Sequence, residues 1–112
     1  MKERGFAVCG CEGTATGRKA VAVDPDIKAA NLRRLRRIEG QVRGLQKMVE
    51  EDRYCADIVT QVASVQEALR GVARQLMRNH LKHCASSAIK AGEPQADAMY
   101  DELLDLVYKH LR

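Results

Sequence analysis

Three residues of types that bind soft metal ions are spaced along the second half of the chain. His80 and Cys84 are four positions apart, so on a helix they share one face, with their Cβ atoms about 6 Å apart. Cys55 precedes His80 by 25 positions. At about 100° per residue, all three fall within about 40° of one another around a helical wheel. Their types and spacing predict a metal site of two thiolates and one imidazole.

The ligand set favours Cu(I) over other metal ions. Cu(I) accepts soft ligands and three-coordination, whereas Zn(II) usually takes four ligands, and Ni(II) and Co(II) prefer more nitrogen and oxygen donors. Spacing alone leaves a second interpretation open, in which Cys55 and Cys84 are small core residues and His80 is a hydrogen-bonded histidine of the same helix face.

A single chain cannot complete such a site. At 1.5 Å per residue, Cys55 and His80 would lie about 37 Å apart on one straight helix. If this helix pairs with its copy in the antiparallel direction, Cys55 of each subunit comes to lie opposite His80 and Cys84 of the other. The prediction is therefore a dimer with two equivalent sites, as its symmetry requires.

The remaining histidines and cysteines have less specific patterns. His83 falls near the centre of the same helical seam, where a structural role is favoured over a ligand role. His110 lies near the C-terminus of the last expected helix, where a histidine suits the helix dipole. Cys9 and Cys11 form a Cys-x-Cys pair that is either a second Cu(I)-binding element or two incidental thiols.

The elements that must position these residues are helices. Helix-forming residues dominate the 112-residue chain, and its two prolines, Pro25 and Pro94, leave the stretch between them free to be helical. Residues 1–23 hold four glycines and no apolar period, so we expect a flexible tail. We expect residues 24–112 to form one helical domain.

Apolar residues repeat at alternating steps of three and four in each expected helix. The first helix begins with Asp24 as N-cap and Pro25 at its first position, and ends near Asp52. The second runs from about Tyr54 to Ala91, and a short third helix follows. The expected fold is an all-α, three-helix protomer, a long antiparallel hairpin plus a C-terminal helix, with an apolar seam for a second copy. The three stripes are Leu35, Ile38, Val42, Leu45 and Val49; then Ile58, Val62, Val65, Leu69, Val72 and Leu76; then Tyr100, Leu104, Val107 and Leu111.

The distribution of charge matters more than the formal net charge of +4. Residues 28–47 carry seven Lys and Arg against the single acid Glu39, while acids crowd the C-terminal part. Charged helix faces are often only solvated surface, but this segregation of sign also fits phosphate binding. No helix-turn-helix pattern is present. A second basic row, at four-residue spacing, lies away from the seam: Arg70, Arg74, Arg78 and Lys82.

Composition also bears on location. No stretch reaches the roughly 18 apolar residues that a membrane helix needs, and no signal peptide opens the chain, so we expect a soluble cytoplasmic protein. Four cysteines in such a protein favour metal binding or thiol chemistry over disulfides.

Three motifs together resemble the CsoR-type copper-sensing operon repressors, within the CsoR/RcnR superfamily. They are Leu35-Arg36-Arg37-Ile38-Glu39-Gly40-Gln41-Val42-Arg43-Gly44, Asp52-Arg53-Tyr54-Cys55, and His80-Leu81-Lys82-His83-Cys84. The resemblance covers roughly residues 28–112. The chain has the copper-sensing pattern at all three ligand positions, whereas nickel, formaldehyde and persulfide sensors of the same fold depart from it.

The resemblance implies a dimeric antiparallel four-helix bundle that assembles into a tetramer on GC-rich operator DNA. Cu(I) would release it and derepress copper-efflux genes. The resemblance further implies an outer shell from Tyr54 and Glu102. It places DNA contacts at Arg34, Arg37, Gln41 and Arg74.

Other functions stay open on the sequence alone. One is a repressor of the same fold that responds to thiol oxidation or persulfide through Cys55 and Cys84. Another is a cytosolic copper buffer or chaperone with no DNA role, which the arginine rows disfavour. A cysteine-histidine hydrolase using Cys84 and His80 is disfavoured because the seam offers no substrate cleft. We therefore expect no enzyme.

Overall fold

The computed structural model describes residues 13–14 and 17–110, and most of them are helical. Two-residue strands β1 (Gly13–Thr14) and β2 (Gly17–Arg18) form a small antiparallel ladder. The helices are α1 (Pro25–Glu50), α2 (Cys55–Asn79), the π-helix η1 (His80–Ala85), α3 (Ser86–Ala91) and α4 (Gln95–His110). The prediction of an all-α fold is confirmed. Most of the predicted tail, including Cys9 and Cys11, lies outside the described residues.

The N-terminus of α1 follows the Asp-Pro-Asp signal. The side chain of Asp24 accepts hydrogen bonds from the backbone N–H groups of Asp26 (2.9 Å) and Ile27 (3.4 Å). Pro25 stands where its missing N–H costs nothing, because the first N–H groups of a helix have no partner within it. The helix ends at Glu50, two residues before the predicted end, and Asp52 turns the chain with a φ of 55°.

The second predicted helix is continuous along the chain from Cys55 to Ala91, as expected, but it is not uniform. Its middle part, η1, has the wider turn of a π-helix, with hydrogen bonds from residue i to i+5. The helical-wheel angles assumed for His80, His83 and Cys84 therefore change, because those angles rest on a regular α-helix. Gly92, with a φ of 83°, ends α3.

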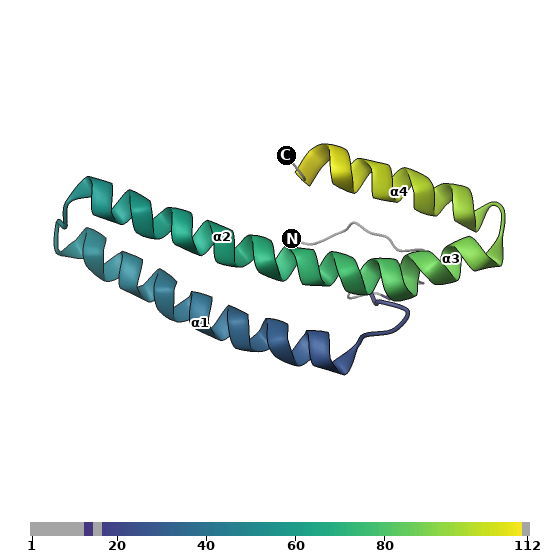
Figure 1. Cartoon of the computed structure of the whole chain (residues 1–112), viewed down its shortest axis with the longest axis horizontal. Helices are drawn as coiled ribbons and strands as arrows, with labels where there is room; N and C mark the ends of the chain where they lie inside the picture. The colour runs from purple at the N-terminus through teal and green to yellow at the C-terminus, as the bar shows by residue number, and fades with distance from the viewer. Residues whose placement is uncertain (1–12, 15–16, 111–112) are drawn as a thin grey trace. The chain divides into compact units, whose positions relative to one another are not determined.

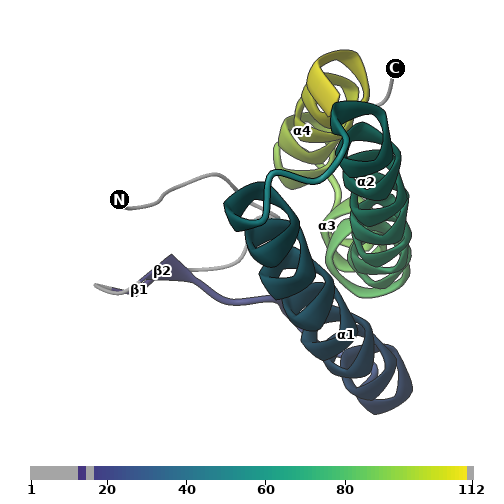
Figure 2. The same cartoon turned by 90° about the vertical axis from the view of Figure 1, so that its left-hand side faces the viewer.

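The chain divides into two compact units, Asp24–Met77 and, as the second, Met1–Val23 with Arg78–Arg112. In the first unit α1 and α2 run in opposite directions from a short turn (Figures 1 and 2). Ile38 of α1 packs with Val65 and Val72 of α2, and partly buried Leu45 and Ala68 extend this cluster. The predicted hairpin is thus held by the centres of its two stripes.

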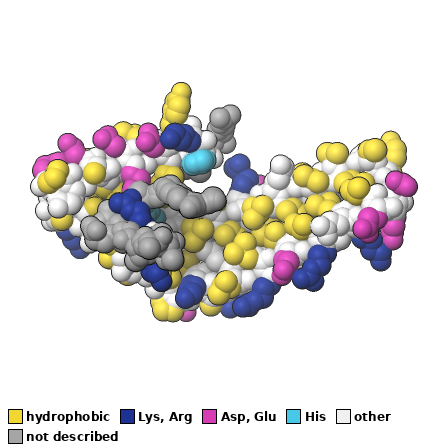
Figure 3. All heavy atoms as spheres, turned by 180° about the vertical axis from the view of Figure 1, so that it is seen from behind, with side chains coloured by type: hydrophobic (Ala, Val, Ile, Leu, Met, Phe, Trp, Pro, Cys, Tyr) yellow, Lys and Arg dark blue, Asp and Glu magenta, His cyan; other side chains and the backbone are white. Residues whose placement is uncertain are grey.

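Much of the remaining apolar stripe of the hairpin is exposed. Val42 and Val62 keep 40% and 38% of their surface, and both line an open groove that runs between α1 and α2. In Figure 3 hydrophobic side chains form a row along the hairpin, with Lys and Arg side chains along its margin. The groove is completed by Leu45, Gln46, Val49, Glu50 and Ile58.

In the second unit α4 runs back alongside α3 (Figure 1). Its core is formed by Cys84 and Ala85 of η1 with Ala96 and Met99 of α4, all nearly inaccessible to solvent. The buried faces of η1 and α4 thus bring a candidate ligand, Cys84, into a dry environment. None of the helices in the described part of the chain is long and apolar enough to span a membrane.

Candidate metal centre

His80 and Cys84 are the first and fifth residues of η1 and belong to one turn of the helix. Cys84 is 1% exposed. The His80 side chain is 17% exposed. A soft sulfur and an imidazole are therefore both held within the second unit.

Glu102 of α4 meets His80 from the facing helix. Glu102 Oε2 lies 2.8 Å from His80 Nε2, and both side chains are 17% exposed. The two groups are close without forming a well-aligned hydrogen bond. The structure thus brings together two residues that the sequence resemblance relates across an interval of 22 positions.

Burial changes the protonation of this pair. It raises the pKa of Glu102 to about 7, and the positive charge of Arg18 acts in the opposite direction. Burial also lowers the pKa of His80 below its ordinary value of 6.5. Burial thus favours the neutral imidazole, which is the form that binds a metal ion.

The segment that precedes α1 contacts the same site. The backbone N–H of Val21 donates a hydrogen bond to Cys84 Sγ, at an N–S distance of 3.4 Å. The side-chain amide of Asn79 donates to the carbonyl oxygen of Ala22 at 3.1 Å. Asn79 is the residue before His80 and is 7% exposed. Chain positions near 20 therefore border a site formed by positions near 80.

Cys55 belongs to the first unit, whereas the other two predicted ligands belong to the second. It is the first residue of α2, an exposed free thiol, and the neighbouring Tyr54 is also exposed. Among the described residues of one chain, no group of three or more His, Cys, Asp or Glu side chains could hold a metal ion.

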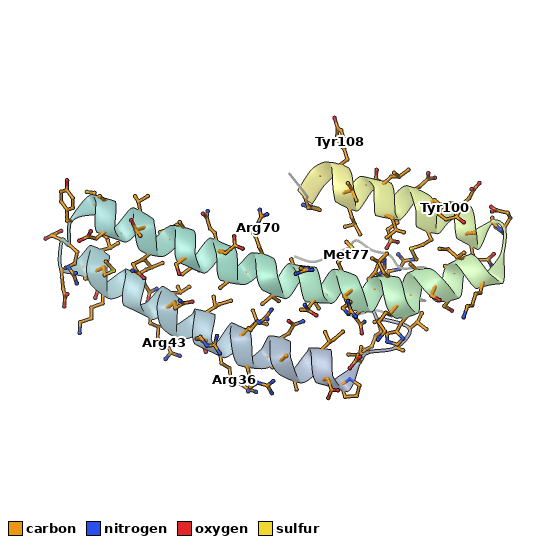
Figure 4. The ribbon with its side chains drawn as sticks, in the orientation of Figure 1. Arg36, Arg43, Arg70, Met77, Tyr100 and Tyr108 are labelled. Carbon is orange, nitrogen blue, oxygen red and sulfur yellow. The ribbon has the colours of Figure 1, made fainter. Side chains whose placement is uncertain are left out.

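The residues expected to contact DNA all lie in the hairpin unit. Arg34, Arg37 and Arg74 are exposed, while Gln41 is partly buried. The guanidinium of Arg34 reaches across to Gly71, where an added Cβ would lie 3.1 Å from its Nη1 atom. Figure 4 shows the α1 side chains of Arg36 and Arg43 pointing away from α2.

Ion pairs neutralise only part of this basic surface. Arg43 pairs with Glu39 at 3.3 Å, and Arg70 on α2 with Glu67 at 3.5 Å. Within the part of the chain that the structure describes, no carboxylate pairs with the arginines near the start of α1. Those unneutralised residues are Arg33, Arg34, Arg36 and Arg37.

Sequence reasoning missed the contacts of Val21, Ala22 and Asn79. Both hydrogen bonds use a backbone atom, which every residue carries, so the side chains of Val21 and Ala22 give no indication of them. Asn79 offered a weak signal, since an asparagine inside an apolar helical seam needs a hydrogen-bond partner. Its partner lies 57 positions away along the chain.

Comparison with known proteins adds a family to this geometry. Residues 27–109 match the sequence model of a family described as metal-sensitive transcriptional repressor. The copper-sensing transcriptional repressor CsoR of Bacillus subtilis (strain 168) is 51% identical over 76 residues, which are 68% of this chain and 73% of that protein. The copper-sensing transcriptional repressor RicR of Mycobacterium tuberculosis is 51% identical over 70 residues, 62% of this chain and 73% of that protein.

Solved structures show the same similarity in three dimensions. The crystal structure of the copper-sensing repressor CsoR with Cu(I) from Geobacillus thermodenitrificans NG80-2 matches with a TM-score of 0.73 and 40% identity. The match covers 82% of this chain and 94% of that one. A variant of the formaldehyde-responsive regulator FrmR from Salmonella enterica serovar Typhimurium matches with a TM-score of 0.56 and 29% identity, over 78% of this chain and 93% of that one.

Proposed function

Because the chain belongs to the family of metal-sensitive transcriptional repressors, we propose that it represses transcription until Cu(I) binds Cys55, His80 and Cys84. The family resemblance seen in the sequence motifs is confirmed, as is the expectation that the chain is a regulator and no enzyme. DNA is accordingly a partner. A repressor acts where the chromosome lies, so the proposal also implies a cytoplasmic protein.

One observation supports the site above others. His80 and Cys84 stand on one turn of η1, with the thiol buried and the imidazole ring held against Glu102. Since Glu102 faces Nε2 of the ring, Nδ1 is the nitrogen left for a metal ion. A glutamate at this position is placed to accept the outer N–H of a metal-bound imidazole, which would orient the ring and make it a stronger donor. These residues fit a soft, low-coordinate ion.

The third ligand must come from a second subunit on this proposal. Cys55 is exposed at the start of α2, and the described part of a single chain gathers no three-donor group. The open apolar groove of the hairpin is suited to an antiparallel copy. When bound, Cu(I) supplies a three-coordinate link between sulfur and nitrogen donors of the two chains.

The unneutralised arginines of α1, together with Gln41 and Arg74 on the same unit, would bind operator DNA in the metal-free state. The arginine side chains can bind the phosphates of DNA. The resemblance further implies a GC-rich operator and a tetramer. A metal ion shifts such an equilibrium only through different affinities for the two states, commonly by about 1–3 kcal/mol. Release would then derepress copper-efflux genes.

The persulfide-sensing alternative is weaker. Redox-sensing cysteines are solvent-accessible, and of the two thiols in this alternative Cys55 is exposed whereas Cys84 is 1% exposed. His80 would also have no role in that chemistry, although it is held against Glu102. The copper-buffer alternative is also weaker, because a buffer would not bind DNA, whereas the family consists of transcriptional repressors.

An anaerobic Cu(I) titration of the DNA-bound protein tests the proposal. We expect wild-type protein to leave the DNA, and X-ray absorption to find two sulfurs and one nitrogen at the metal. His80→Ala should remain on the DNA at Cu(I) concentrations that release the wild type. His110→Ala, which removes a histidine from the last turn of α4, is the matched control and should behave as wild type. Full Cu(I)-dependent release of His80→Ala would refute the assignment.

A further inference from the structure

The chain segment before α1 contributes to the environment of Cys84. We propose that the backbone N–H of Val21 is an outer-shell hydrogen-bond donor to the sulfur of this ligand, and that Asn79 anchors the segment that carries it. The inference rests on the proposed function, because it concerns Cys84 as a metal ligand. It adds a positioning element outside the helices that hold His80 and Cys84.

Two hydrogen bonds join the segment before α1 to the helix that carries His80 and Cys84. Val21 N–H points to Cys84 Sγ at 3.4 Å, a distance that suits a donor to sulfur. One residue further on, the carbonyl of Ala22 accepts from Asn79 Nδ2 at 3.1 Å. Asn79 adjoins His80 in the chain and is buried. The extended segment is therefore tied to the helix within one turn of each candidate ligand.

Hydrogen bonds to a sulfur ligand alter the site. A thiolate is an anion, so an N–H aimed at its sulfur stabilises the negative charge and fixes the direction of the lone pairs. Residues that support metal ligands in this way commonly change metal affinity by about 10–100-fold when they are replaced. A backbone donor is also insensitive to the identity of its side chain, so only a change that removes the N–H abolishes it.

Proline is that change, because it lacks the N–H. We expect Val21→Pro to weaken Cu(I) binding about tenfold in an anaerobic competition with a coloured Cu(I) chelator, and Val21→Ala to stay within about twofold of wild type. The near-ultraviolet thiolate-to-Cu(I) absorption band should shift in Val21→Pro and not in Val21→Ala. In the metal-free wild-type protein, the Val21 amide proton should exchange with solvent at least about tenfold more slowly than in an unstructured peptide.

A second variant guards against misfolding of the proline variant. Asn79→Leu keeps the size of the side chain and removes its amide donor, and it should weaken Cu(I) binding in the same direction while circular dichroism reports intact helices. Equal affinities and spectra for Val21→Pro and Val21→Ala, with normal wild-type binding, would overturn this inference alone. Failure of the wild-type protein to bind Cu(I) would overturn the proposed function together with it.

Discussion

The His80 ring and the Glu102 carboxyl lie side by side in a partly buried site. Burial shifts the pKa of each group so that its neutral form is favoured. A neutral imidazole is ready to bind metal without first losing a proton. A carboxyl with a pKa of about 7 can hold or release a proton close to physiological pH. Burial therefore favours the neutral form of both groups in the metal-free protein.

The raised pKa of Glu102 predicts a pH dependence of stability. The folded chain holds this proton more tightly than the unfolded chain, so the stabilisation is complete below the ordinary value of 4.5 and is lost as pH rises through about 7. His80 acts in the opposite direction, because its pKa is lowered.

Comparison with Glu102→Gln isolates the contribution of the carboxyl. Between about pH 5 and 8, the free energy of unfolding of the metal-free wild type should fall relative to that of Glu102→Gln. Urea unfolding at one protein concentration measures it. Glu93→Gln, at an exposed position, is the control and should follow wild type. Parallel pH profiles for wild type and Glu102→Gln would contradict the buried carboxyl.

The sequence predicted which residues form the candidate site better than it predicted the contacts that they make. The types and spacing of Cys55, His80 and Cys84 suffice to propose a soft-metal site, because the type of a side chain determines which metal ions it can bind. The hydrogen bond from Val21 to Cys84 is not predictable in this way, since it joins a backbone group to a sulfur 63 positions away.

The N-terminus of α1 could be predicted directly from the sequence. Asp24 caps the helix with two hydrogen bonds, and Asp26 adds acid to its first turn. The segment that carries Val21 and Ala22 connects the Cys84 site to α1 along the chain, because Ala22 lies only three residues before Pro25. The cap therefore fixes where the extended segment ends and the basic helix begins.

Removal of this cap should be measurable. Asp24→Ala is expected to lower the free energy of unfolding by about 1 kcal/mol, because two N–H groups lose their acceptor. Asp24→Ser retains a side-chain oxygen at the N-cap and should lose much less. Urea unfolding monitored by circular dichroism compares the two. Equal losses would show that charge or solvation at position 24 matters more than capping.

The π-helix η1 was not predicted. A π-turn has no compositional signature, and the stripe that identifies α2 ends at Leu76, before η1 begins at His80. Regular periodicity predicted the helix from Cys55 to Ala91 but not its wider turn. That turn holds both His80 and Cys84, which agrees with the frequent use of π-turns at functional sites.

For the whole molecule, the hairpin leaves apolar surface that its own residues do not cover. Val42, Val49 and Val62 are exposed beside the buried cluster around Ile38. The sequence predicted the stripes and a partner for them, because the seam is longer than the third helix can cover. A second copy is the partner that the proposed shared metal site would require.

A charge placed in the groove should separate the subunits. Val62→Glu would bury an unpaired carboxylate against the partner, so we expect a shift toward monomer in sedimentation velocity, with loss of Cu(I) binding. Thr60→Glu adds the same charge to the same helix at an exposed position outside the groove, and should keep the wild-type assembly. An unchanged assembly for Val62→Glu would mean that subunits meet elsewhere.

The proposed site, with Cys55 from one chain and His80 and Cys84 from another, has a consequence for the cell. Donors contributed by two chains come together only when the chains do, so mass action makes the apparent copper affinity rise with the abundance of the protein. A cell that makes more of this repressor should respond at a lower copper threshold, and dilution should raise that threshold. The set point of such a sensor is then adjusted by its own expression level as well as by its ligands.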